Sequence, residues 1–166
     1  MTTEIKAEAA RDAAGLLAAT WPLGVPVDPV SIARRVGLRV VDAPMDEDTM
    51  GALMKQPHQD PTIMINQGDG ENRRRFTCAH ELGHFVRRAE EAEEYATVDL
   101  RSGLSAAGSD PEEIYANEFA ACLLMPADSI KTYRETGLSD LEMAIRFRVS
   151  RGAMQHRLEN LGLANS

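Results

Sequence analysis

The stretch FTCAHELGHFV, residues 76–86, constrains the fold of this chain more than any other part of its sequence. If this stretch is a helix, apolar residues cover two of its sides, so little of its surface can face solvent. One side carries Phe76, Ala79, Gly83 and Val86, and the other carries Cys78, Leu82 and Phe85. The same helix carries His80, Glu81 and His84. A buried polar group without a partner destabilises the folded state by about 2–7 kcal/mol. The fold therefore has to bring compensating groups to these three side chains.

A metal ion would compensate all three side chains. His80 and His84 are one helical turn apart, so both imidazoles project from nearly the same face and can reach one ion. Glu81 is offset sideways, where its carboxylate meets a water molecule rather than the ion itself. This arrangement is typical of zinc hydrolases, although manganese and iron accept the same ligands. The alternative is a pair of hydrogen-bonded core histidines, but the chain has only 4 histidines and two of them stand in this register, which favours the metal.

The third metal ligand is expected in PEEIYANEFAACLLMP, residues 111–126. If this segment is a helix, Glu113 and Asn117 lie one turn apart on a face that continues with Ala120 or Ala121 and Leu124 and has Ala116 beside it. The small residues on this face, together with Gly83, would let the two helices approach closely, so that Glu113 completes the ligand set. Asn117 would then hydrogen-bond a ligand imidazole. The alternative for Glu113 is a capping box with Asp110 as the N-cap.

The segments RRRFTCAHELGHF and EIYANEFAACLLMP resemble the signature of the ImmA/IrrE family of metallopeptidases, in which HExxH is followed by ExxANxFAxxLLMP. The likeness covers the chain from about residue 26 to its end. It implies that His80, His84 and Glu113 are the metal ligands and that Glu81 is the catalytic base, with the family asparagine at Asn117. It also implies a zinc-dependent endopeptidase that cleaves a cognate helix-turn-helix repressor, in stress responses or in the control of mobile elements.

The C-terminal segment offers a different function, that of a DNA-binding transcription regulator with a structural or sensing metal. Its apolar spacing is typical of a helix-turn-helix unit, and it is locally basic through Arg146, Arg148, Arg151 and Arg157. The net charge of −8 and the pI of 5.0 weigh against DNA. We therefore favour a helical unit that packs on the catalytic part or recognises the protein substrate. A third alternative is a toxin-like or antitoxin-like partner whose metal centre does not hydrolyse peptides.

The hydrophobic patterns predict an α+β fold with a small antiparallel sheet of about three strands, a zincin-like active-site helix pair and a helix-turn-helix-like C-terminal unit. We expect a zincin-like domain over 1–135 and a small helical subdomain over 136–166. The segment TIMIN, 62–66, should pair antiparallel with GALMK, 51–55, and is either an edge strand open to a peptide or an ordinary core strand. From residue 70 onward we expect helices only, over about 71–89, 111–124, 127–135, 138–147 and 150–160.

The remaining features concern the surroundings of the site. No apolar run reaches the roughly 20 residues that cross a bilayer, and the N-terminal segment is acidic where a signal peptide would be basic, so we expect a cytoplasmic protein. Its two cysteines, Cys78 and Cys122, should be thiols that pack like small hydrophobic side chains. Three residues are candidates for a second electrophile during catalysis: Tyr95, Arg101 and, less favourably placed on its helix, Tyr115.

Overall fold

The computed structural model describes residues 1–88, 93–101 and 110–165. In this part of the chain, seven helices and four strands form an α+β fold, which confirms the predicted class. The helices are α1 Thr2–Thr20, α2 Pro29–Arg35, α3 Glu71–Arg88, α5 Pro111–Leu124, α6 Ala127–Glu135, α7 Asp140–Phe147 and α8 Arg151–Asn160. The strands are β1 Arg39–Ala43, β2 Thr49–Lys55, β3 Thr62–Asn66 and β4 Tyr95–Leu100.

The four strands form one mixed sheet in the order β1-β3-β2-β4. The predicted antiparallel pairing of β2 with β3 is present, with Leu53 opposite Ile63. However, β1 pairs with β3 in parallel, and β4 adds to β2 in the antiparallel direction, with Thr97 opposite Leu53. The sheet is therefore four-stranded and mixed, not three-stranded and purely antiparallel.

Strand β4 corrects the prediction that only helices follow residue 70. Side chains of the strand alternate between the two faces of the sheet, and those on the uncovered face remain in solvent: Val98 is 61% exposed and Leu100 is 41% exposed, while Asp99 between them is buried. This inverts the usual alternation of apolar-in and polar-out. With a run of glutamates before it, the segment does not read as a strand. The rest of the connection, residues 89–92 and 102–109, lies outside the described residues.

The structure also decides the position of TIMIN, which is β3. This strand lies between β1 and β2, so it is a core strand and its backbone is not free to pair with a peptide. Of the two alternatives, the core strand is therefore the correct one and the edge strand is wrong, because β1 pairs in parallel with β3 on the side away from β2. The two edges of the sheet are β1 and β4.

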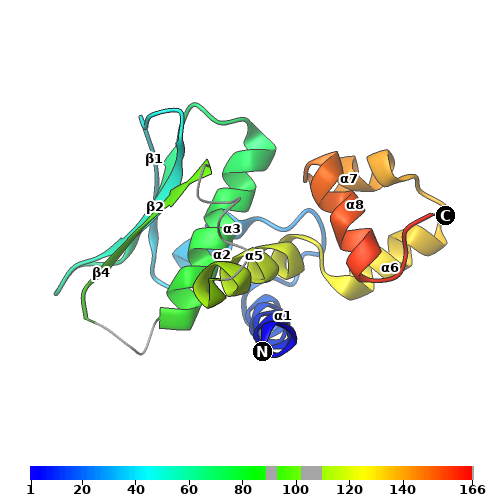
Figure 1. Cartoon of the computed structure of the whole chain (residues 1–166), viewed down its shortest axis with the longest axis horizontal. Coiled ribbons are helices and arrows are strands. Elements are labelled where there is room, and N and C mark those ends of the chain that lie inside the picture. Colours follow the sequence, from blue (N-terminus) through cyan, green and yellow to red (C-terminus); the bar gives the residue numbers. More distant parts are fainter. Residues whose placement is uncertain (89–92, 102–109, 166) are drawn as a thin grey trace.

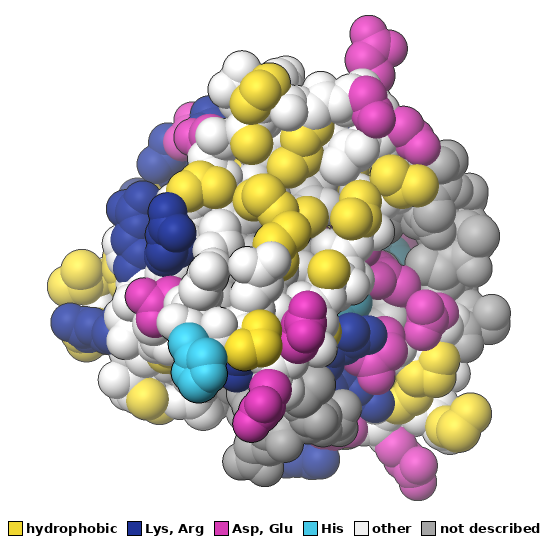
Figure 2. Space-filling model, turned by 90° about the vertical axis from the view of Figure 1, so that its left-hand side faces the viewer, with side chains coloured by type: hydrophobic (Ala, Val, Ile, Leu, Met, Phe, Trp, Pro, Cys, Tyr) yellow, Lys and Arg dark blue, Asp and Glu magenta, His cyan; other side chains and the backbone are white. Residues whose placement is uncertain are grey.

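All the described helices lie on one side of the sheet (Figure 1). The opposite face is open and carries a band of hydrophobic side chains (Figure 2), among which Met54, Val98 and Leu100 are the most exposed. On the covered side, Leu53 and Ile63 are fully buried and belong to the same core as α3. The sheet therefore serves as a one-sided support for the helices.

Helix α5 packs between α1 and α3. Asp110 caps its N-terminus by accepting a hydrogen bond from the backbone N–H of Glu112 at 3.0 Å, and Pro111 occupies the first turn, where its missing N–H is not needed. The core side chains of α5 are fully buried: Tyr115, Ala116, Phe119, Ala120, Leu123 and Leu124. Burial of one large side chain of this kind stabilises the fold by about 1.5–3 kcal/mol, so α5 is fixed firmly.

Helices α6, α7 and α8 lie together at the end of the molecule away from the sheet (Figure 1). A capping box between Ser139 and Glu142 starts α7, and the rings of Tyr133 and Phe147 meet edge to face at 5.6 Å. The guanidinium of Arg157 is buried and its Nε donates a hydrogen bond to the carbonyl of Met125 at 3.0 Å, which ties α8 to the end of α5. The division of the chain after residue 135 stays a prediction.

The two cysteines are free thiols, as expected. Burial raises the pKa of Cys78 to about 12 and that of Cys122 to about 11, so both are protonated at neutral pH and pack as apolar groups. Among the described residues, no helix is both long enough and apolar enough to cross a membrane.

Candidate metal centre

The two histidines of α3 point at the same place in the interior. Their Nε2 atoms are 3.1 Å apart, and the two rings lie nearly perpendicular with centroids 4.7 Å apart. His80 and His84 are each only 1% exposed. Because the helical spacing brings both Nε2 atoms to one spot, the pair presents two nitrogen donors to that spot.

Glu113 of α5 approaches the same spot with both carboxylate oxygens. Oε2 lies 3.2 Å from Nε2 of His80, and Oε1 lies 3.0 Å from Nε2 of His84. The capping box considered for Glu113 is not formed, since its side chain turns to the imidazoles and Asp110 caps the helix through the N–H of Glu112. The structure thus brings together His80, His84 and Glu113.

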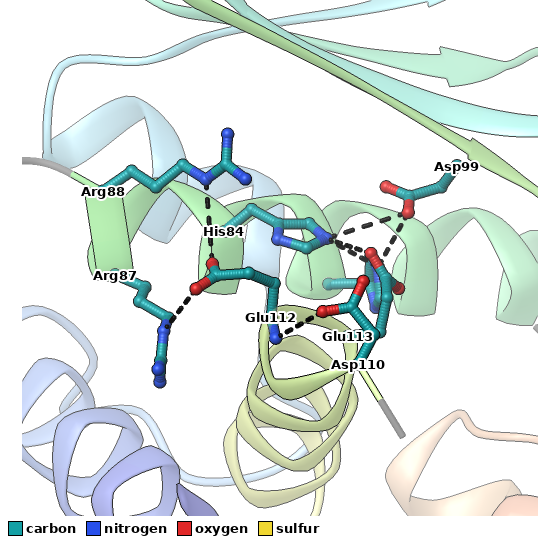
Figure 3. Close-up of polar contacts among 8 residues, drawn as sticks. His84, Arg87, Arg88, Asp99, Asp110, Glu112 and Glu113 are labelled. Carbon is teal, nitrogen blue, oxygen red and sulfur yellow. Dashed lines mark hydrogen bonds and ion pairs between the residues drawn. The ribbon is translucent and has the colours of Figure 1, made fainter. Parts of the chain in front are cut away.

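A fourth donor comes from Asp99 of β4, which sequence reasoning missed. Its Oδ1 lies 3.3 Å from Nε2 of His80 and 3.7 Å from Nε2 of His84. Figure 3 shows this carboxylate reaching in from the sheet while Glu113 reaches in from α5. One signal in the sequence could have identified it: an acid stands between the apolar residues Val98 and Leu100. An acid on the inward side of a strand destabilises the fold unless it has a partner.

The four donor groups fit a divalent metal. The donor atoms of His80, His84, Asp99 and Glu113 all lie within 4.8 Å of one another, and three of the four residues are buried. Imidazole nitrogen and carboxylate oxygen are ligands that zinc, manganese and iron accept. Two carboxylates also match the charge of a divalent ion. This cluster can therefore hold a metal.

The electrostatics of the four donor side chains lead to the same conclusion. Burial disfavours the charged imidazole, but hydrogen bonds to Asp99 and Glu113 outweigh it and raise the pKa of His80 to about 9. The pKa of His84 shifts in the same direction for the same reasons. Burial would raise the pKa of each carboxyl group, yet the hydrogen bonds to the histidines lower the pKa of both Asp99 and Glu113. The carboxylates thus attract positive charge to the point where an ion would sit.

Glu81 lies beside this cluster and is not part of the donor set. It is fully buried, and neither of its carboxylate oxygens has a hydrogen-bond partner among the described residues. Burial, followed by the close interaction with the Asp99 carboxyl and then by the charges of Asp99 and Glu113, raises its pKa well above the ordinary value for a glutamate. Strand β2 closes over it at Gly51, where an added Cβ would be 3.8 Å from Oε1. A buried carboxyl with free oxygens and a raised pKa is suited to accept and return a proton.

The structure does not show the hydrogen bond expected between Asn117 and a ligand imidazole. The side-chain oxygen of Asn117 is buried and has no partner in the part of the chain that the structure describes, and the same holds for the Nδ1 atoms of His80 and His84. Asn117 instead lines a cleft of about 750 Å³ between α3, α5 and α8. Its walls begin one turn from the donors, at Phe76 and Asn117, and are mostly apolar.

Two of the three candidate electrophiles are engaged elsewhere. The hydroxyl of Tyr115 donates a hydrogen bond to Asp12 of α1 at 2.5 Å, on the far side of α5 from the centre. The guanidinium of Arg101 forms an ion pair with Asp69 and donates from Nε to the carbonyl of Glu47 at 2.6 Å. The hydroxyl of Tyr95 is buried without a partner among the described residues.

Comparison with known proteins agrees with this geometry. Residues 33–159 match the model of the M78 peptidase family, described as the IrrE N-terminal-like domain. The matched range contains the donor set and Glu81, and it begins after α1. The chain is also 25% identical over 118 residues, 71% of its length and 71% of the relative's, to "Uncharacterized immunity region protein 2" of Bacillus phage phi105.

Proposed function

Because the chain belongs to the M78 peptidase family of IrrE N-terminal-like domains, we propose that it is a zinc-dependent endopeptidase that cleaves a cognate helix-turn-helix repressor in the cytoplasm. Membership of the family supports a metallopeptidase-type function. The observation that carries the proposal is the convergence of the His80, His84 and Glu113 donors beside the unpartnered carboxyl of Glu81.

In this proposal, His80, His84 and Glu113 hold the metal. When bound, the ion supplies Lewis acidity, which polarises the scissile carbonyl and lowers the pKa of water. Glu81 takes a proton from the water molecule while the water oxygen attacks the carbonyl carbon. Glu81 later gives that proton to the leaving amine nitrogen as the C–N bond breaks. A general base works best when its pKa lies near the working pH. Burial raises the pKa of Glu81 from its ordinary acidic value toward that range.

The apolar cleft would receive the peptide next to the centre. It begins at Phe76, whose ring centroid lies 6.2 Å from that of His80, and continues past Ile114 and Ala121 to Val149. A mostly apolar pocket with a few polar groups is the usual character of a binding site. The repressor as substrate is supported by the family resemblance and by the phage relative, which is named for an immunity region.

The DNA-binding alternative is not favoured, because three of the four C-terminal arginines are engaged within the chain. Arg148 forms an ion pair with Glu71 of α3. Arg146 lies over the ring of Tyr133 at 4.8 Å, and Arg157 is buried against the carbonyl of Met125. These side chains are not free to neutralise phosphates, which is the main source of affinity for DNA.

The substitution Glu81→Gln tests the proposal. The purified protein, loaded with zinc, is incubated with candidate helix-turn-helix repressors, beginning with any that is encoded beside its gene, and fragments are identified by mass spectrometry. We expect the wild type to cut and Glu81→Gln to lose at least about 100-fold in rate, since removal of a general base costs about 10²–10⁴-fold. The metal content, measured by elemental analysis, should not change, because Glu81 is outside the donor set.

Glu135→Gln is the matched control, since Glu135 is an exposed residue at the end of α6. It should cut like the wild type. If the wild type and the repressor never yield fragments at any metal loading, the assignment as a repressor protease fails.

A further inference from the structure

We propose that Asp99 is a fourth protein ligand of the metal, so that the resting centre is closed to water until this carboxylate withdraws. The inference rests on the proposed function only in that it needs a divalent metal bound by His80, His84 and Glu113. It adds a latent state to the enzyme, controlled by one side chain of strand β4.

The first observation is the side of the imidazoles that Asp99 approaches. An acid that merely orients a ligand histidine contacts the outer ring nitrogen, the one that does not face the metal. Here, Oδ1 of Asp99 lies near Nε2 of both His80 and His84, the same two atoms that Glu113 contacts. The outer Nδ1 atoms of both rings have no partner among the described residues. Asp99 therefore stands inside the donor set.

The second observation is the number of donors. Catalytic zinc sites keep three protein ligands and an open fourth position, whereas sites with four protein ligands are closed. The four donor atoms of this centre lie within 4.8 Å of one another and come from α3, α5 and β4, that is, from different directions. With Asp99 in place, the fourth position is taken by the protein itself.

The third observation is charge. Two neutral imidazoles with Asp99 and Glu113 carry a charge of −2, which a divalent ion neutralises. Without Asp99, the same ion and ligands would keep one positive charge. Asp99 is 6% exposed and both histidines are 1% exposed, so the neutral arrangement is the more stable one in this buried place.

The fourth observation is that β4 is anchored close to Asp99. Two residues further on, the backbone N–H of Arg101 donates to the carbonyl of Asp48 at 2.7 Å, and its side chain holds Asp69 and the carbonyl of Glu47. On the strand itself, Asp99 is opposite Gly51 of β2. The backbone that carries the Asp99 carboxylate is thus held in place. The centre can open only if the side chain of Asp99 rotates away or if strand β4 moves.

The test uses cobalt(II) as a spectroscopic replacement for zinc and azide as a small anion that needs an open coordination position. The full-length wild type, Asp99→Asn and the control Asp42→Asn are compared. Asp42 is also an aspartate on a strand, but it lies on β1 and forms an ion pair with Arg74 of α3. Cobalt affinity is measured by competition with a chelating dye, and azide binding by the change in the visible cobalt bands.

We expect Asp99→Asn to bind cobalt at least about tenfold more weakly than the wild type and to bind azide at least about tenfold more tightly, because one charged ligand is lost and one position opens. Asp42→Asn should match the wild type in both titrations. If Asp99→Asn fails to fold, Asp99→Ser supplies the same comparison with a small neutral side chain. Equal cobalt and azide affinities in the wild type and the Asp99 variant would overturn the inference.

These titrations need no substrate, so they separate this inference from the proposed function. A difference between the variants, without cleavage of any repressor by the wild type or by the opened Asp99→Asn variant, supports the latent centre and counts against the protease. Cleavage by a wild type whose titrations coincide with those of Asp99→Asn supports the protease and removes Asp99 from the donor set.

Discussion

Gly83 of α3 lies against Phe119 of α5 so closely that a Cβ added to the glycine would be 3.0 Å from the ring and 3.2 Å from the backbone of Ala116. This close approach brings Glu113 within reach of the histidines. We expect Gly83→Ala to lower the free energy of unfolding by up to about 2 kcal/mol, since overpacking costs about 1–3 kcal/mol and helix propensity returns about 1 kcal/mol. Metal affinity should also fall. Urea unfolding and chelator competition measure the two effects.

Gly15→Ala is the matched control for this substitution. Gly15 lies inside α1, is exposed, and an added Cβ would meet nothing within 4 Å. Here, alanine should stabilise the protein by about 0.5–1 kcal/mol through helix propensity alone. If Gly83→Ala stabilises the protein as Gly15→Ala does, the helices do not depend on this close contact.

Metal binding should depend on pH through the imidazoles of the centre. Because Asp99 and Glu113 raise the pKa of His80 to about 9, the metal-free protein keeps a proton on this ring at neutral pH, and the metal has to displace it. Apparent affinity should therefore rise by about tenfold per pH unit between about pH 7 and 9 for each displaced proton, and then level off. Chelator competition at several pH values gives the slope. A flat profile over this interval would contradict the raised pKa of His80, and the exposed His58 provides the control variant His58→Ala.

The sequence predicts the helical part of this protein well, for a physical reason. Helices α3 and α5 carry long apolar patterns, and α5 has an N-cap and a proline at its start, so local interactions define both. The convergence of His80, His84 and Glu113 follows from the helical period together with Gly83, which permits the close approach of α5. These features depend on interactions between residues that are near one another in the chain.

The features missed by the prediction depend on contacts between distant segments. Strand β4 is held in place by β2, more than forty residues earlier in the sequence, and its outward side chains are apolar and exposed. The position of Asp99 in the donor set depends on that pairing. The parallel pairing of β1 with β3 is equally non-local. Because strand pairing is set by tertiary packing, the local pattern could not supply the fourth donor.

The hydrogen bond from Tyr115 to Asp12 fastens α1 to α5. Tyr115→Phe should lower the free energy of unfolding by about 1.5 kcal/mol, the lower end for a bond to a charged group, because Asp12 is only half-buried and can be hydrated. The rate of cleavage should not change, since this hydroxyl faces away from the centre. Tyr133→Phe, which removes a hydroxyl without a hydrogen bond among the described residues, is the control. A large loss of rate in Tyr115→Phe, with stability intact, would restore Tyr115 as an electrophile.

Arg157 supports the cleft between α5 and α8, because its buried side chain pairs with the carbonyl of Met125. Arg157→Met keeps the apolar length of the side chain but leaves that carbonyl without a partner, so we expect a loss of about 1–3 kcal/mol in the free energy of unfolding. Arg151→Met, at the exposed start of α8, should stay within about 0.5 kcal/mol of the wild type. Urea unfolding monitored by circular dichroism measures both. Equal stability of the two variants, with loss of binding to DNA in both, would instead return these arginines to a DNA-binding role.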